Sequence, residues 1–90
     1  QQKKELRNYY IKEYKNLNNI EKEIIDYCLH NHITSFQEPL FDGDYFISAI
    51  YSLINKRFGT NINYGGEFMM NKYCYDVLLK YTREKDGSND

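Results

Sequence analysis

The sequence predicts an all-α fold, a compact bundle of about four helices. Apolar residues recur at helical spacing in four separate segments, and polar or glycine residues that terminate helices lie between them. The single proline, Pro39, also lies between two of these segments. A chain of 90 residues is the size of one small domain. We expect one helical domain over residues 1–85, excised from a longer chain, and a polar tail at residues 86–90.

The first two predicted helices occupy residues 3–15 and 19–30. The apolar stripe of the first helix consists of Leu6, Tyr10, Tyr14 and Leu17. Asn18 and Glu21 have the spacing of a capping box and therefore predict the start of the second helix. The second helix is expected to bury Ile20, Ile24, Ile25, Cys28 and Leu29.

The third predicted helix starts at residues 42–44 and ends before Gly59, and the fourth covers residues 67–84. The third helix has two adjacent stripes, which predict that it is the most buried one; they are Phe46, Ile50, Leu53 and Arg57, and Ile47, Tyr51, Ile54 and Phe58. The inward face of the fourth helix is predicted to hold Met70, Cys74, Val77, Leu78 and Tyr81.

An alternative fold is a winged-helix-like α+β domain. In that fold, residues 32–36 and 61–64 form short strands instead of connecting loops.

Composition and spacing argue against several kinds of chemistry. The chain is 41% hydrophobic and contains no run long enough to cross a bilayer. Cys28, His30, His32 and Cys74 lack the spacing of a zinc site, and no nucleophile lies in a catalytic motif. We therefore expect no enzyme, no metal and no cofactor. Two cysteines on apolar helix faces favour reduced, buried thiols and a cytoplasmic location.

Charge is distributed in blocks along the chain. Residues 1–16 and residues 51–83 each carry five basic and two acidic side chains, whereas residues 17–50 carry one basic and six acidic side chains. Acidic and aromatic residues alternate around the start of the third helix, which favours a protein-binding face for a basic partner surface. The predicted contact residues are Phe36, Glu38, Phe41, Asp42, Asp44 and Tyr45.

The leading functional prediction is a non-catalytic protein-interaction domain, an inhibitor or regulator that binds a basic surface such as the nucleic-acid channel of an enzyme. Asn, Tyr, Lys and Ile are the most abundant residues and have AT-rich codons, which is typical of phages, plasmids and other AT-rich sources. One alternative is an oligomerisation domain of a regulator that forms a homodimer. The other is nucleic-acid binding through the basic first helix and the fourth helix, by Asn71, Lys72, Tyr75, Lys80 and Arg83.

Overall fold

The computed structural model describes residues 2–36, 43–61 and 68–87, which form four helices and three short strands. In chain order these are α1 (Gln2–Lys15), α2 (Asn19–Asn31), β1 (Ser35–Phe36), α3 (Gly43–Asn55), β2 (Gly59–Asn61), β3 (Phe68–Met70) and α4 (Lys72–Gly87). The predicted predominance of helix is confirmed. Helix α4 begins five residues later than predicted and extends two residues into the predicted tail.

The start of α2 follows the predicted capping chemistry. The Asn18 side chain accepts a hydrogen bond from the Glu21 backbone N–H at 2.8 Å, and Glu21 Oε1 accepts one from the Asn18 N–H at 3.0 Å. These reciprocal bonds form the predicted capping box. At the other end, His32 adopts a left-handed conformation with φ 54°, which lets its N–H and that of Ile33 bond back to the last turn.

A small antiparallel sheet distinguishes the structure from the predicted all-α class. The strand order is β1-β3-β2, and Met69 of β3 lies opposite Ser35 on one side and Thr60 on the other. Strand β1 falls within the first strand of the alternative prediction, and β2 overlaps the second at Asn61. Strand β3 lies where the fourth helix was expected to begin, because pairing with both neighbours satisfies its backbone groups.

Gly59 permits the close approach of β2 to β3. A Cβ at this position would lie 2.3 Å from the Met69 carbonyl oxygen and 2.6 Å from the Phe68 ring. The absence of a side chain at Gly59 therefore lets Phe68 fill the inner face of the sheet.

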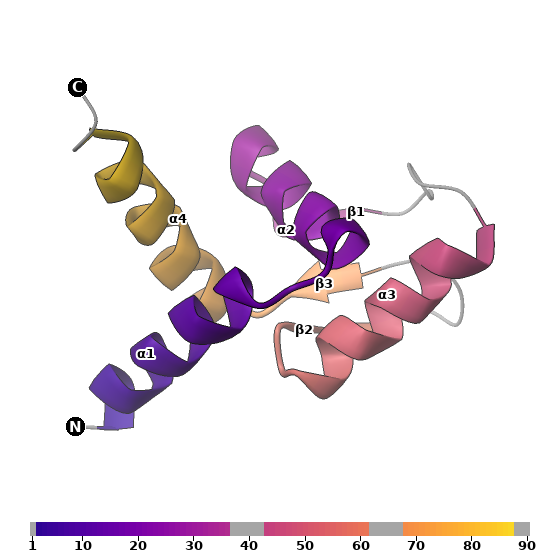
Figure 1. Ribbon diagram of the computed structural model, residues 1–90, viewed down its shortest axis with the longest axis horizontal. Coiled ribbons are helices and arrows are strands. Elements are labelled where there is room, and N and C mark those ends of the chain that lie inside the picture. The colour runs from indigo at the N-terminus through magenta and orange to yellow at the C-terminus, as the bar shows by residue number, and fades with distance from the viewer. Residues whose placement is uncertain (1, 37–42, 62–67, 88–90) are drawn as a thin grey trace.

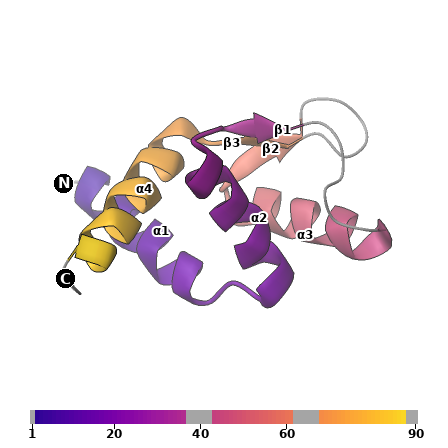
Figure 2. The ribbon, with the colours of Figure 1, turned by 90° about the horizontal axis from the view of Figure 1, so that it is seen from above.

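The helices pack in two pairs. Helix α1 packs against α4, and α2 packs against α3 (Figure 1). Figure 2 shows the three strands along one side of the molecule, with α2 between the sheet and the α1–α2 connection. The outer face of the sheet exposes Ser35, Thr60 and Met69, and its inner face buries Phe68 and Met70.

The core confirms most of the predicted inward stripes. All of the following are buried: Tyr10, Tyr14, Leu17, Ile24, Ile25, Cys28, Leu29, Ile50, Leu53, Phe58, Met70, Cys74, Val77 and Leu78. Ile20, Ile54 and Tyr81 are partly buried against this cluster. Leu6 is 41% exposed, so its placement in the core stripe of the first helix is wrong. The N-terminal turns of α1 extend past the core, which begins at Tyr10.

Tyrosine hydroxyls connect α1 to the rest of the fold. Tyr9 donates a hydrogen bond to the Lys56 carbonyl at 2.9 Å, and Tyr10 donates one to the Arg57 carbonyl at 2.8 Å. These carbonyls follow the end of α3, where no further helical N–H is available to them. Tyr73 of α4 donates to the Lys3 carbonyl at 2.9 Å. Tyrosine thus contributes both apolar area and a hydrogen bond at each contact.

A partly buried ion pair connects α2 to the end of α3. The Glu21 side chain is 2% exposed, and its Oε1 and Oε2 atoms lie 2.9 and 3.1 Å from Lys56 Nζ. Burial raises the pKa of Glu21, but hydrogen bonds from Ser52, Lys56 and the Asn18 N–H, together with the Lys56 charge, outweigh it. The resulting pKa is below the ordinary value of 4.5.

Candidate functional site

The predicted partner-binding residues surround the start of α3. Glu38, Phe41 and Asp42 lie outside the described residues. The backbone of Phe36 forms part of β1, and the backbones of Asp44 and Tyr45 lie in the first turn of α3. The side chains of these three residues are outside the described part of the structure. Ile47 is therefore the first residue of this region whose side chain the structure describes.

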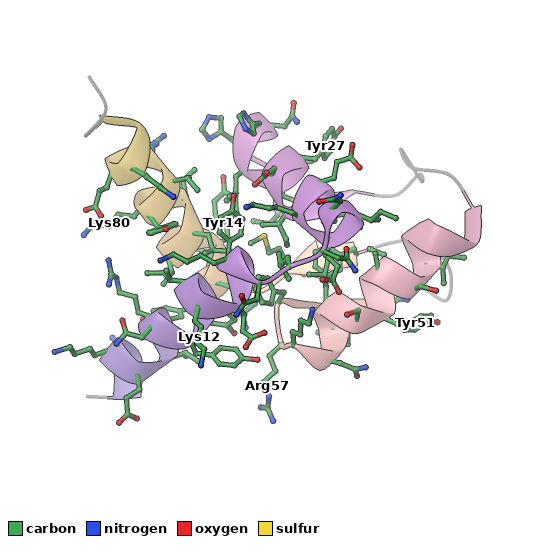
Figure 3. The ribbon with its side chains drawn as sticks, in the orientation of Figure 1. Lys12, Tyr14, Tyr27, Tyr51, Arg57 and Lys80 are labelled. Carbon is green, nitrogen blue, oxygen red and sulfur yellow. The ribbon has the colours of Figure 1, made fainter. Side chains whose placement is uncertain are left out.

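The second apolar stripe of α3 is largely exposed, so the prediction that α3 buries both stripes is wrong. Ile47 is 44% exposed, Tyr51 is 53% exposed, and Ile54 is partly buried. Within α3, the stripe containing Ile50 and Leu53 enters the core, because α2 and the sheet cover one face of the helix. Beyond the end of α3 the pattern reverses: Phe58 of the second stripe is buried, and Arg57, which was predicted to face inward, is exposed. We call Ile47, Tyr51 and Ile54 the α3 stripe. Figure 3 shows the Tyr51 side chain projecting from the helix.

The α3 stripe lies on an almost uncharged helix. Asp44 is the only charged residue between Gly43 and Asn55, although 28% of the whole chain is charged. A helix face that is exposed to water is normally polar, so an apolar face needs a reason beyond folding. The sequence already indicated this exposed apolar face, since two adjacent apolar stripes cover more of the helix surface than packing against the core requires.

A groove lies between α1, the sheet and the beginning of α4. Its volume is about 770 Å³. Leu6 and Met69, which are 41% and 44% exposed, open onto it. We call this the α1–sheet groove, and its lining consists of Leu6, Tyr10, Thr34, Ile54, Arg57, Gly59, Thr60, Met69, Met70, Asn71, Lys72 and Tyr73. Sequence reasoning missed it because its walls come from elements far apart in the chain.

The charged residues of the α1–sheet groove are both basic. Arg57 and Lys72 line it, and no carboxylate does so among the described residues. Arg57 has a φ of 68°, a left-handed conformation that glycine adopts at much lower cost. Its N–H and that of Phe58 bond back to Ile54 and Leu53, closing the end of α3. Figure 3 shows the Arg57 side chain pointing away from the body of the molecule.

The predicted nucleic-acid residues divide between the surface and the core. Lys80 and Arg83 are exposed on α4, and Lys72 lies 3.4 Å from Asp76 in an exposed pair. The Asn71 side chain accepts a hydrogen bond from the Cys74 N–H and caps α4. Tyr75 is buried, so the prediction that it faces a duplex is wrong.

The packing of α1 against α4 brings two basic segments together. We call these helices the basic helix pair. Their exposed cations are Lys3, Lys4, Arg7, Lys12, Lys15, Lys72, Lys80, Arg83 and Lys85. Lys15 and Lys85 approach the Tyr81 ring from the two helices, with their Nζ atoms 5.8 and 5.7 Å from the ring centroid. In Figure 3, Lys12 and Lys80 point outward from this pair.

A smaller polar cavity of about 290 Å³ lies between α2 and α4. Asp26, His30, His32 and Arg83 line it, and the Tyr14 hydroxyl donates a hydrogen bond to Asp26 Oδ1 at 2.6 Å. The lining hydroxyl of Thr82 bonds to the carbonyls of Leu78 and Leu79 within α4. Its proton is therefore engaged with the helix and is not directed into the cavity.

The cysteines are free and buried, as predicted. Burial raises the pKa of the Cys28 thiol to about 12 and also raises that of Cys74. Both therefore stay protonated near neutral pH, in which form they are weak nucleophiles and weak metal ligands. Within residues 2–36, 43–61 and 68–87, no three His, Cys, Asp or Glu side chains are grouped to hold a metal ion.

Comparisons with known proteins identified no relative of this chain. No protein-family model, no curated protein and no solved structure matches the chain. In the part of the chain that the structure describes, none of the helices has the length and apolar character needed to cross a membrane.

Proposed function

We propose that the protein is a non-catalytic protein-binding domain that contacts its partner through the α3 stripe. The observation that carries this proposal is the exposure of Ile47 and Tyr51 on a helix with a single charge. Clustered exposed apolar side chains mark interaction surfaces more often than isolated ones do. Tyrosine is also enriched among the residues that dominate binding free energy, because it buries a large area at a small cost in side-chain entropy.

The α3 stripe continues the contact surface predicted from the sequence. Ile47 follows the predicted contact residues Asp44 and Tyr45 along the same helix. Because Asp44 belongs to the same helix, the composition of this segment supports a partner with an apolar pocket bordered by basic residues. An inhibitor or regulator of a nucleic-acid enzyme, the role expected from the sequence, fits this surface chemistry.

Affinity capture with matched variants tests this proposal. The baits are the wild type, the double variant Ile47→Ala/Tyr51→Ala, and the control Leu6→Ala/Met69→Ala, which removes similarly exposed apolar side chains from the α1–sheet groove. We expect a protein retained from a nuclease-treated low-GC bacterial lysate by the wild type and the control. Recovery by the stripe variant should fall at least tenfold, because truncating an interface anchor costs about 2 kcal/mol or more.

Two results would contradict the proposal. Equal recovery by the stripe variant and the wild type would remove the α3 stripe from the interface, and loss confined to the control would move the interface to the groove. Truncation of exposed side chains changes stability by about 0.5 kcal/mol or less, so all baits should unfold at similar temperatures.

The basic helix pair favours a second candidate function, the binding of nucleic acid. The two helices, Gln2–Lys15 and Lys72–Gly87, together carry nine basic and five acidic side chains, although the whole chain has a net charge of −1. The packing of α1 against α4 brings these two basic segments together, which supports a basic binding surface. Such a surface attracts phosphate groups regardless of base sequence.

Salt dependence of duplex binding tests the second candidate. Fluorescence anisotropy should give a log–log slope of affinity against salt of about −2 or steeper, since each phosphate contact contributes about −0.9. Lys80→Ala/Arg83→Ala should make the slope shallower by about 2, whereas Lys22→Ala on α2 should leave it unchanged. A slope near zero in the wild type would eliminate nucleic-acid binding by this surface.

A further inference from the structure

We propose that the α1–sheet groove is a second docking site, which binds an apolar protein segment that carries carboxylates. It differs from the α3 stripe in position and in the charge of its partner. Only Ile54 belongs to both surfaces. The proposal does not depend on the α3 stripe, because the two surfaces can be tested separately. Substitutions of Leu6 and Met69 change the groove, whereas substitutions of Ile47 and Tyr51 change the stripe.

The groove offers an open apolar lining. Leu6 and Met69 are the two exposed large hydrophobic residues outside α3 in the described chain, and both line this groove. Met69 is unbranched and adapts to the shape of a bound side chain. A volume of about 770 Å³ is sufficient for several apolar side chains of a partner segment.

Charge selects an acidic segment for the groove. Arg57 and Lys72 line it, and the described lining contains no carboxylate. The Lys72–Asp76 pair is exposed and its N–O distance is 3.4 Å, so exchanging Asp76 for a partner carboxylate costs little.

Hydrogen bonds hold the walls of the groove in place. Tyr10 joins α1 to the Arg57 carbonyl, and Tyr73 joins α4 to the Lys3 carbonyl. The Asn71 N–H donates to the Phe58 carbonyl at 2.7 Å, which joins the beginning of α4 to the end of α3. A preformed groove requires little ordering when a segment binds, so more of the contact energy appears as affinity.

The conformation of Arg57 supports a role in binding. Closing the end of α3 requires a left-handed residue at this position, and glycine meets that requirement with less strain than arginine. The Arg57 guanidinium makes no hydrogen bond or ion pair among the described residues. Its exposed charge is therefore available to a ligand carboxylate, as a bidentate partner.

Fluorescence anisotropy with designed peptides tests this docking site. The probe is a labelled peptide of about twelve residues in which leucines at helical spacing alternate with glutamates, and the control peptide has lysine at every glutamate position. At low salt we expect the acidic peptide to bind at least tenfold more tightly than the basic one. Met69→Glu and Arg57→Glu should each weaken binding of the acidic peptide at least tenfold.

Ile47→Glu is the matched control, because Ile47 and Met69 are both 44% exposed and both variants add one negative charge. It should change the affinity less than twofold. Equal binding of the two peptides, or equal weakening by Ile47→Glu and Met69→Glu, would overturn the groove as an acidic-segment site. Binding that survives replacement of every leucine by serine would also overturn it, since electrostatic attraction alone would then explain the affinity.

Discussion

Replacing Leu53 with alanine is expected to lower the free energy of unfolding by about 2–5 kcal/mol. Leu53 is completely buried on the inward stripe of α3, next to Ile50, which is 1% exposed. The substitution removes apolar contacts and leaves a cavity that neighbouring side chains fill only in part. A small domain is stable by about 5–15 kcal/mol, so this loss is a large fraction of the total.

Urea denaturation followed by circular dichroism measures this effect, with Tyr51→Ala as the control. Both residues lie on α3, but Tyr51 is on the exposed stripe and its truncation should cost about 0.5 kcal/mol or less. A loss below about 1 kcal/mol for Leu53→Ala, or equal losses for the two variants, would show that the wrong face of α3 has been assigned to the core.

Replacing Glu21 with alanine is expected to destabilise the protein by about 2–4 kcal/mol at neutral pH. The Glu21 carboxylate is buried, accepts the Asn18 N–H and pairs with Lys56, so its loss leaves a partly buried ammonium group and removes one of the two hydrogen bonds of the capping box. The Lys56 side chain is 31% exposed, which allows some rehydration and places the expected cost below that of a fully buried pair.

The contribution of Glu21 should depend on pH. Its pKa in the folded protein is below the ordinary 4.5, so the unfolded chain binds a proton more readily than the native protein does. The stabilisation is complete above about pH 4.5 and disappears as the pH falls through the lower folded pKa. Glu21→Gln should therefore be less stable than the wild type at pH 7, and the difference should shrink at lower pH.

Urea titrations at pH 7 and near pH 3 measure this difference, and Glu23→Gln is the control. Glu23 is exposed on the same helix and the substitution removes the same charge. A stability difference between Glu21→Gln and the wild type that is independent of pH would contradict the depressed pKa. A pH-dependent loss of equal size in Glu23→Gln would attribute the effect to overall charge rather than to the Lys56 pair.

Local chemistry accounts for the features that were predicted correctly. The Asn18–Glu21 capping box depends on residues three apart, so the sequence alone determines where α2 begins. The burial of Ile24, Cys28 and Leu78 follows from helical spacing, because apolar residues with that spacing lie on one face of a helix and that face packs into the core. The two cysteines were correctly predicted to be buried for the same reason.

The strands could not be assigned with the same certainty, because each contains only two or three residues. Phe68, Met69 and Met70 precede a helix and are compatible with its first turn. Their strand conformation depends on Ser35 and Thr60, which are distant in the sequence. Pairing of this kind is a nonlocal property that periodicity within a short window does not contain.

The candidate binding surfaces were also decided by packing. The sequence determined that α3 has two apolar stripes and that α1 carries an excess of positive charge. Only the tertiary structure selected Leu53 for the core and left Tyr51 in water, since α2 and the sheet cover one face of α3. It likewise formed the α1–sheet groove from Leu6, Met69 and Arg57, which adjoin only because α1 is held across the end of α3.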